Sequence, residues 1–471
     1  TQLASLLETF FAHTDPQIES FEQAVAQFQQ QVPELAQGLE QLIEEERTHP
    51  SGAFETAFQA FVELCRTAIN PNISEDAIEK MLVQHLLTER LFRTVFKRSD
   101  FTSQNAIAHQ IERVITQLTR RMGGRDAYLQ QLDPFYAAIE DAATTITDPH
   151  AKQDFLNTVY ERFFQGYSRE QADTHGIVYT PQAIVRFMWA SVEHVLQQQF
   201  GHGLTTQGVK ILDPCTGTGN FIVSLLERLH AADPAALPLK YAADLFANEV
   251  MLLPYYIASQ NIEQTYRELT GTYQSFEGLC FVDTLDLYEN AQLRMTFEEQ
   301  NTERIQRETA ADLTVIIGNP PYNVGQVNEN DNNKNRTYPV VDKRVRETYA
   351  QASRATNKNA LSDMYVKFVR WATDRLRDKD GIVCFVTNNG FIDGIAFDGM
   401  RQHLAQEFTT IYHLDLHGNV RQNPKLSGTT HNVFGIQVGV GITLAVRRRA
   451  TAGQAGAEPC PIFYYRVPEF W

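Results

Sequence analysis

The stretch that decides the fold is Ile211-Leu212-Asp213-Pro214-Cys215-Thr216-Gly217-Thr218-Gly219-Asn220-Phe221. It begins in a short apolar run, which is typical of a buried strand, and it leads into a helical pattern at residues 219–230. Gly217 and Gly219 permit a tight strand-to-helix turn and close approach of a ligand to the backbone. Because open α/β sheets bind ligands at the carboxyl ends of their first strands, this turn predicts a ligand site. The alternative is a plain strand-to-helix turn.

Short apolar runs alternate with helical patterns from about residue 166 onward, whereas the chain before this point carries only helical stripes. This order predicts an all-α domain over residues 1–165 and an α/β domain with a largely parallel, Rossmann-like sheet over residues 166–471. The predicted strands are 209–212, 241–248, 313–317, 381–387, 409–416 and 434–445. The predicted helices of the second domain are 181–199, 219–230, 250–261, 361–377 and 398–407.

The composition of the 471 residues is that of a soluble globular protein with two or three domains. No apolar run is long enough to span a membrane, and the first residues lack the basic region of a signal peptide. The five cysteines are odd in number and widely spaced, which fits a reducing cytoplasm without structural disulfides. The net charge of −16 lacks the basic footprint of a self-sufficient nucleic-acid binder, so any contact with DNA is expected to be local.

Acidic residues come after two of the expected strands and after one further apolar stretch. Asp213 lies beside the glycine turn, where the lysine of a phosphate-binding loop is absent, so a cationic ligand group is favoured. Glu249 ends the second strand, where a carboxylate suits ribose hydroxyls or simply a helix N-terminus. Asp283 follows the next apolar stretch and either accepts a hydrogen bond from an adenine amino group or caps a turn.

Tyr179-Thr180-Pro181 precedes the first helix of the α/β domain. Thr180 and Pro181 suit the N-cap and the first helical position, and the helix start is also a place for one end of a cofactor. No paired His or Cys lies at the spacing of metal ligands, so no metal site is predicted.

Residues Asn319-Pro320-Pro321-Tyr322 come directly after the apolar run at 313–317. Two prolines remove two backbone donors and cannot continue a sheet, which leaves a stiff loop with a side-chain amide, free carbonyls and an aromatic ring. Such a loop can accept hydrogen bonds from a planar amino group and stack on the ring that bears it, as methyl transfer to an exocyclic nitrogen requires. The alternative is a Pro-rich turn with an incidental Tyr. Residues 323–343 are polar and predict a long loop beside this motif.

These motifs, in this order, resemble the gamma-type amino-group DNA methyltransferases, which include type I modification subunits. The preceding helical region resembles the coupler of single-chain type ISP restriction–modification enzymes. The resemblance implies an S-adenosylmethionine-dependent adenine-N6 DNA methyltransferase that acts on a flipped-out base. The implied catalytic residues are Asn319, Pro320, Pro321 and Tyr322, in which Asn319 and the Pro320 carbonyl hold the amino group and Tyr322 stacks on the base. The implied cofactor-binding residues are Tyr179, Thr180, Asp213, Pro214, Gly217, Gly219, Asn220, Phe221, Glu249 and Asp283.

The chain departs from this family after the catalytic region. It stops at Trp471 without a target-recognition domain, starts at Thr1, and contains no Gly-x-x-x-x-Gly-Lys-Ser/Thr motif of a motor. We therefore expect a piece of a larger restriction–modification protein, or a subunit that needs a partner to act on double-stranded DNA. Two other functions stay open: a protein-glutamine N5 methyltransferase of the release-factor kind, and a non-catalytic coupling module. Cytosine-N4 methylation is also chemically possible.

Overall fold

The computed structural model describes residues 33–48, 52–68, 73–95, 105–120, 129–130, 133–145, 155, 180–287, 299–322, 337–418, 434, 438–449 and 460–468. The chain divides into two compact units, Thr1–Thr67 with Pro71–Asp173, and Ala68–Asn70 with Thr174–Trp471. The division near residue 173 and the boundary expected at 165 both fall within residues 156–179, which lie outside the described part.

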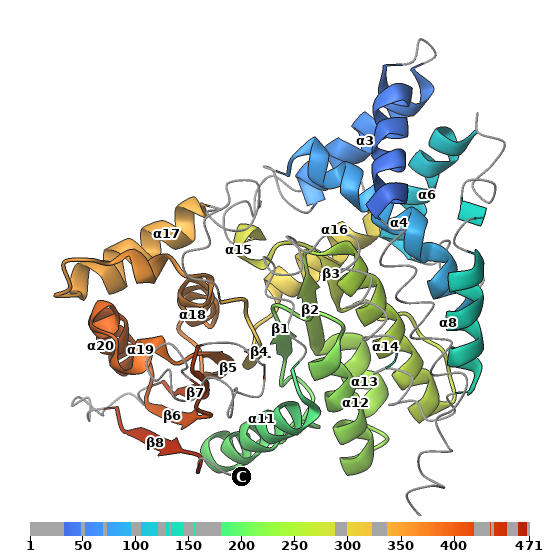
Figure 1. Ribbon diagram of the computed structural model, residues 1–471. Coiled ribbons are helices and arrows are strands. Elements are labelled where there is room, and N and C mark those ends of the chain that lie inside the picture. Colours follow the sequence, from blue (N-terminus) through green and yellow to red (C-terminus); the bar gives the residue numbers. More distant parts are fainter. Residues whose placement is uncertain are drawn as a thin grey trace, which may run out of the picture. The chain divides into compact units, whose positions relative to one another are not determined.

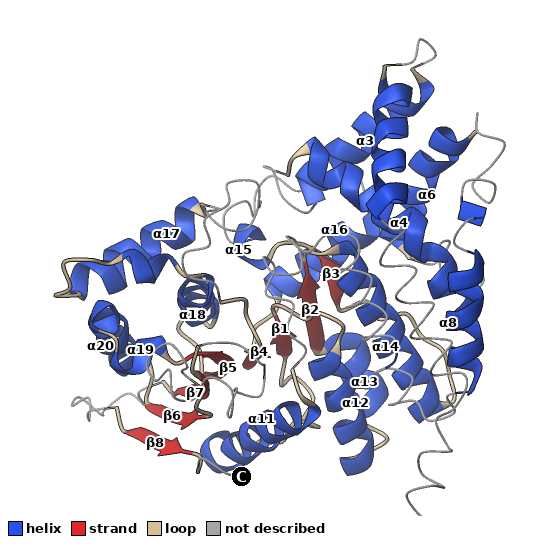
Figure 2. Ribbon diagram, in the orientation of Figure 1, coloured by secondary structure: helices blue, strands red, loops and turns tan. Residues whose placement is uncertain are grey.

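The described residues of the first unit are helical, as the sequence predicts (Figures 1 and 2). Their helices are residues 33–47, α3 (Ala53–Ala68), α4 (Glu75–Val95), α6 (Ala106–Thr119) and α8 (Asp133–Thr145). Phe54, Phe58 and Phe61 recur at helical spacing on α3 and are buried. Asn105 caps α6 by accepting a hydrogen bond from the Ala108 amide at 3.0 Å.

The second unit is built on one eight-stranded sheet with the order β3-β2-β1-β4-β5-β7-β6-β8 (Figure 2). The first five strands in this order are parallel, β7 runs antiparallel to β5 and β6, and β8 is parallel to β6. The strands are β1 (Ile211–Asp213), β2 (Leu245–Glu249), β3 (Leu279–Phe281), β4 (Val315–Gly318), β5 (Gly381–Asn388), β6 (Thr410–Asp415), β7 (Val440–Arg447) and β8 (Ile462–Arg466). The α/β architecture expected from the alternating pattern is confirmed.

Helices cover both faces of this sheet, with α11, α12 and α14 on one side and α17, α18 and α20 on the other (Figure 1). The α-helices of the unit are α11 (Gln182–Val195), α12 (Asn220–Ala232), α13 (Leu237–Ala243), α14 (Leu252–Thr270), α15 (Thr284–Leu287), α16 (Glu299–Ala310), α17 (Pro339–Val345), α18 (Met364–Arg375), α19 (Gly390–Asp393) and α20 (Asp398–Glu407). Short helical turns of other kinds are Leu196–Phe200, Arg346–Ala350, Asn359–Ser362 and Ile395–Phe397.

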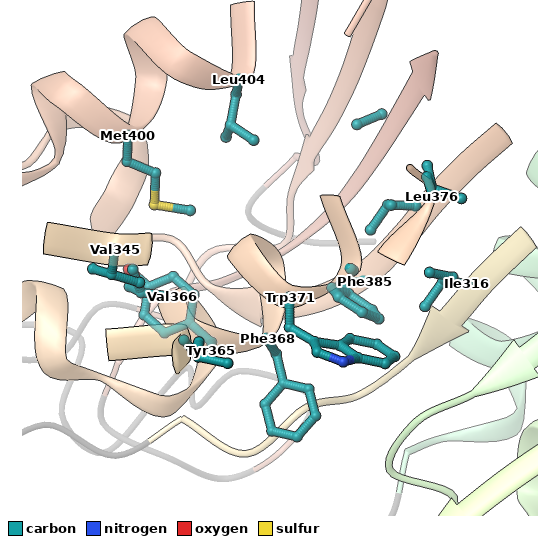
Figure 3. Packing of buried hydrophobic residues seen from close by; sticks show 14 of the residues in the cluster. Ile316, Val345, Tyr365, Val366, Phe368, Trp371, Leu376, Phe385, Met400 and Leu404 are labelled. Carbon is teal, nitrogen blue, oxygen red and sulfur yellow. The ribbon is translucent and has the colours of Figure 1, made fainter. Parts of the chain in front are cut away.

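The core of the second unit lies on a row of side chains that the strand register sets side by side. Phe246, Leu212, Ile316 and Val383 pair in sequence across β2, β1, β4 and β5, so they point to the same face. These side chains belong to one buried cluster with residues of α17, α18 and α20, part of which Figure 3 shows around Trp371. Burial of this cluster holds the parallel strands and their carboxyl ends in place.

Three segment predictions are wrong in part. Residues 241–243, predicted as strand, end helix α13, because Tyr241 packs its ring on Tyr266 at 3.9 Å rather than in the sheet. Short apolar runs do not distinguish a buried helix from a strand. The last long strand begins at Val440, not at residue 434. The loop predicted over 323–343 ends earlier than expected, since Pro339 begins α17, and residues 323–336 lie outside the described part.

Leu212→Ala should destabilise the second unit by about 2–5 kcal/mol, because it deletes a side chain at the centre of the buried row. Urea denaturation followed by the fluorescence of Trp189 and Trp371 would measure this loss. The matched control is Leu239→Ala, which changes a leucine that is 57% exposed and should shift stability by no more than about 0.5 kcal/mol. Equal shifts for both variants would contradict the assignment of the row as core.

Candidate functional site

The candidate site lies at one edge of the sheet, where the carboxyl ends of the parallel strands meet. Asp213 ends β1, Glu249 ends β2, and Asp283 comes two residues after β3. Asn319 directly follows β4, the strand that pairs with β1 on its other side. The structure therefore brings together residues that lie far apart in the chain.

Asp213 is fully buried and organises its own loop. Its two carboxylate oxygens accept hydrogen bonds from the Cys215 amide at 3.2 Å and the Thr216 hydroxyl at 3.0 Å. Burial raises the pKa of Asp213 to about 7, and these two hydrogen bonds oppose the rise. In this arrangement Asp213 shapes the turn, and its contact with a ligand stays a prediction.

The glycine turn is held down on the end of β2. The Thr216 amide donates to the Asn248 carbonyl at 3.0 Å, and the Gly217 amide donates to the Glu249 carboxylate at 2.9 Å. The second carboxylate oxygen of Glu249 accepts from the Met251 amide at 2.7 Å, so this side chain also fixes the backbone just before α14. Burial raises the pKa of Glu249 to about 7, and the hydrogen bonds from backbone amides oppose this rise.

Gly219 ends the turn with a φ of +89°, a conformation that side chains with a Cβ rarely adopt. A Cβ at this position would lie 3.2 Å from the Cα of Ala258, so the glycine also lets α12 approach α14 closely. Phe221, in the first turn of α12, is buried with its ring edge against Trp189, and its carbonyl accepts from the indole nitrogen at 2.9 Å. In this structure Phe221 packs in the core.

Pro214 and Asp283 are connected through the start of α15. The Pro214 carbonyl accepts a hydrogen bond from the Thr284 hydroxyl at 2.6 Å. Asp283 accepts from the Leu285 amide at 3.0 Å, which is the capping role that the sequence left open beside ligand binding. Its other oxygen accepts from the hydroxyl of Tyr338 at 3.0 Å. Sequence reasoning missed Tyr338, although the Tyr-Pro pair before α17 marks a helix start that could have drawn attention to it.

Cys215 shows how the three carboxylates combine. This residue is partly buried, and its desolvation is the largest cause of a pKa raised well above the usual value for cysteine. The charges of Asp213, Glu249 and Asp283 each raise this pKa further. All three acids therefore act on one small volume beside the glycine turn, which is a favourable place for positive charge and an unfavourable one for phosphate.

Asn319 is the point where three motifs meet. Its amide nitrogen donates to the Thr180 hydroxyl at 3.1 Å, and the Thr180 carbonyl accepts from the side chain of Asn220 at 2.7 Å. The amide oxygen of Asn319 is buried and has no hydrogen-bond partner in the described part of the chain. An acceptor that is buried, fixed in direction and unpaired is costly for the fold, so its placement indicates a ligand that donates a hydrogen bond.

The start of α11 differs by one residue from the sequence prediction. Pro181 is the N-cap and Gln182 the first helical residue, so Thr180 lies just before the cap position expected for it. The Thr180 hydroxyl accepts from Asn319 and makes no capping contact with α11. The tertiary contact thus takes the place of the local one.

The three residues after Asn319 are buried or partly buried. Pro320 is buried, whereas Pro321 and Tyr322 are partly buried, and the Tyr322 ring packs against the cluster on the α18 face. The Tyr322 hydroxyl is buried without a hydrogen-bond partner among the described residues, and burial raises its pKa. Tyr179, which belongs to the predicted cofactor residues, lies outside the described part of the chain.

A further polar side chain at the same edge was missed. Asn389 comes directly after β5, the neighbour of β4, and its amide nitrogen donates to Asp415 at 2.7 Å and to the Val440 carbonyl at 2.9 Å. The sequence Asn388-Asn389-Gly390 after an apolar strand is a turn signal that could have placed it at this edge.

The described residues form neither a metal site nor a membrane-spanning helix. No group of three or more His, Cys, Asp or Glu side chains among them is arranged to hold a metal ion. None of the helices formed by these residues is both long and apolar enough to cross a membrane.

Comparison with protein families matches two models. Residues 25–151 match the coupler domain of type ISP restriction-modification enzymes, and residues 151–392 match N-6 DNA methylases. No curated protein sequence matches the chain.

Three solved structures are similar over almost the whole chain. The DrdV–DNA complex is 40% identical with a TM-score of 0.86 over 100% of this chain. The ATP-dependent type ISP enzyme LlaBIII bound to DNA is 33% identical with a TM-score of 0.83, and the type ISP enzyme LlaGI with a DNA substrate mimic is 32% identical with a TM-score of 0.82, both over 94% of this chain. The chain spans 45%, 29% and 35% of the lengths of these three proteins, respectively.

Asp213→Asn should change how stability depends on pH. A carboxyl whose pKa rises from about 4 in the unfolded chain to about 7 on folding contributes stability at low pH, which is lost as pH rises through 7. Asparagine removes this titration, so the difference in unfolding free energy between wild type and variant should shrink from pH 5 to about pH 7 and level off above it.

Urea denaturation at four pH values would measure this difference, with the exposed Asp233→Asn as the control. If the difference in unfolding free energy between wild type and Asp213→Asn does not vary with pH, Asp213 is already ionised at pH 5.

Proposed function

Because the chain belongs to the N-6 DNA methylase family and carries a type ISP coupler domain before that part, we propose that it methylates the N6 amino group of adenine in DNA, with S-adenosylmethionine as the methyl donor. The observation that carries this proposal is the Asn319 amide, whose nitrogen is fixed by Thr180 and whose buried oxygen has no partner among the described residues. That oxygen is an acceptor suited to an amino group.

The acceptor side of the reaction rests on the Asn319 loop. An exocyclic amino group carries two hydrogens, and Asn319 Oδ1 and the Pro320 carbonyl would accept one each. Accepting both hydrogens places the nitrogen lone pair out of the ring plane and raises electron density on the nitrogen. As the N–C bond forms and the S–C bond of the donor breaks to leave a neutral thioether, the two carbonyl acceptors would stabilise the positive charge on N6 until one N6 proton leaves to solvent. Positioning and electrostatics therefore account for the step without a separate general base.

The donor side fits S-adenosylmethionine better than a phosphate ligand. This cofactor supplies an electrophilic methyl on a positively charged sulfur. The three carboxylates around Cys215 create a negative potential that favours such a cation, and the glycine turn leaves space beside the backbone. Glu249 would bind ribose hydroxyls while keeping its contacts with Gly217 and Met251, because each carboxylate oxygen can accept two hydrogen bonds.

The pairing of β1 with β4 fixes the distance between the two sides. Gly318 precedes Asn319, and a Cβ at Gly318 would lie 2.7 Å from the carboxylate of Asp213. Only glycine lets the end of β4 lie this close to the acidic loop, so the amino-group acceptor and the cation-favouring turn share one edge. This proximity supports in-line transfer between two bound molecules.

We further propose that residues 1–165 act as the coupler and residues 166–471 as the catalytic domain of a longer restriction–modification protein. DNA is bound in the solved structures of DrdV, LlaBIII and LlaGI, and their greater length supports further modules for target recognition, cleavage or translocation. The family match favours DNA over a release-factor glutamine as acceptor, and the intact Asn319 geometry argues against a purely structural module.

Asn319→Ala should lower the rate of methyl transfer by on the order of 100-fold or more, because it deletes the hydrogen-bond acceptor for the reacting amino group. Binding of S-adenosylmethionine, measured by calorimetry, should stay nearly unchanged. The rate of methyl transfer is measured with labelled methyl on unmethylated genomic DNA, with release factor as a parallel acceptor.

Thr180→Val should lower kcat to a smaller extent than Asn319→Ala, because the Asn319 amide loses the hydroxyl that holds it. Thr180→Ser keeps this hydroxyl and should restore kcat.

The control for this series is Asn357→Ala, which changes an exposed asparagine that is not among the residues assigned to the site. Equal loss of cofactor binding and transfer in Asn319→Ala would reject Asn319 as the amino-group acceptor. Label on release factor rather than on DNA would reassign the substrate to a protein glutamine.

Tyr322 variants separate stacking from hydrogen bonding. Tyr322→Phe should retain transfer, because the hydroxyl has no hydrogen-bond partner among the described residues. Tyr322→Ala should raise KM for DNA by roughly 5- to 150-fold, since stacking on one base is worth about 1–3 kcal/mol. Steady-state kinetics on an oligonucleotide substrate would measure both. Normal KM in the alanine variant would exclude Tyr322 as the stacking platform.

A further inference from the structure

A basic pocket opens at the opposite edge of the sheet from Asn319. It has a volume of about 490 Å³ and is formed where α18 and α20 end, β5 begins and β7 ends. Arg447, the last residue of β7, pairs with Gly381 at the start of β5, so the whole length of β5 separates the pocket from the site. Six arginines line the pocket: Arg344, Arg370, Arg377, Arg447, Arg448 and Arg449.

The charges in the lining do not balance. The pocket contains three acidic residues, Asp374, Asp378 and Glu407, against the six arginines, which leaves a formal charge of 6 − 3 = +3. The whole chain has a net charge of −16, so positive charge here is concentrated against the overall trend. Such a local excess attracts anions.

Two of the acids are already used by two of the arginines. Arg344 makes a two-pronged ion pair with Asp374 at 2.9 and 3.0 Å. Arg370 donates to both oxygens of Glu407 at 3.0 and 2.9 Å and to Asp374 at 2.6 Å. Arg370 is only 1% exposed, and its Nε has no hydrogen-bond partner among the described residues. These pairs build the wall of the pocket from α17, α18 and α20.

The three consecutive arginines at the end of β7 lack such neutralisation. Arg447 is partly buried and donates to three backbone carbonyls, those of Glu407 at 2.8 Å, Thr373 at 2.9 Å and Arg377 at 2.7 Å. Neither Arg447 nor the exposed Arg448 and Arg449 forms an ion pair with a carboxylate in the described part of the chain. Burial lowers the pKa of Arg447, and the nearby charges of Glu407, Asp374 and Asp378 oppose this fall although none of them forms an ion pair with its guanidinium.

We propose that this pocket binds a phosphate group, with Arg447 as the fixed base and Arg448 and Arg449 as the arms that close on it. The planar guanidinium presents its donors in a fork that matches phosphate oxygens, and the three residues follow one another at the mouth of the pocket. The ion pairs of Arg344 and Arg370 hold the walls, which is the role a purely structural network would have. A structural network does not account for Arg448 and Arg449, which are exposed and whose side chains form no ion pair with a carboxylate in the described part of the chain.

This site is independent of methyl transfer. At about 3.3 Å per residue, the eight residues of β5 set the pocket roughly 25 Å from the carboxyl edge of the sheet. The phosphate could belong to a nucleic-acid backbone or to a free oligophosphate, and both share the chemistry that the pocket recognises. The phosphate site does not depend on the methyl-transfer proposal, and the methyl-transfer proposal does not depend on the phosphate site.

The first test is calorimetric titration of the chain with sodium tripolyphosphate. The double variant Arg448→Gln, Arg449→Gln should bind at least about tenfold more weakly than wild type, because it removes two charged donors from the mouth. Arg267→Gln, which changes an exposed arginine on α14, is the matched control and should bind like wild type. Both variants should retain the wild-type thermal midpoint without ligand.

A second measurement distinguishes the sources of the phosphate. If the pocket contacts a DNA backbone, log affinity for duplex DNA should depend less steeply on log salt in the double variant. The magnitude of this slope should be smaller by about 2 than in wild type. Loss of tripolyphosphate binding with an unchanged slope would assign the pocket to a free oligophosphate. Tripolyphosphate affinity and DNA slope that are both unaffected in the double variant would overturn the proposal.

Discussion

The hydrogen bond from Asn319 to Thr180 is the contact on which the arrangement of the site depends. It joins the loop after β4 to the start of α11, and Thr180 in turn accepts a hydrogen bond from Asn220 at the start of α12. Since the donor capacity of the amide is directed to Thr180, its oxygen is left facing the site as an acceptor. A single side chain thereby links the core of the fold to the chemistry that we propose.

Burial of charge sets the character of each edge of the sheet. At the carboxyl edge, Asp213 and Glu249 are almost completely buried, and their raised pKa values show that the fold holds them at a cost. At the amino edge of β5, Arg447 is held in a comparable way with the opposite sign. A cationic ligand would lower the cost at the first edge, and an anionic ligand would do so at the second.

The two edges also bear on how a chain with a strongly negative net charge could act on the DNA substrate that we propose. Net charge describes the molecule at long range, whereas binding depends on local potential. The cation-favouring turn beside Cys215 is where we propose that S-adenosylmethionine binds, and positive charge is gathered elsewhere, in the arginine pocket. The similar proteins DrdV, LlaBIII and LlaGI are much longer than this chain, which spans 45%, 29% and 35% of their lengths.

The sequence by itself determined the fold class and the order of the motifs, because periodicity and turn chemistry are local properties that survive without tertiary context. It placed the glycine turn, the acidic strand ends and the Asn-Pro-Pro-Tyr loop on the correct elements. Only the tertiary structure decided the partners: that Thr180 anchors Asn319, that Tyr338 reaches Asp283, and that arginines from α17, α18 and β7 converge. These contacts join residues far apart in the chain, and packing of the sheet core, not any local pattern, brings them together.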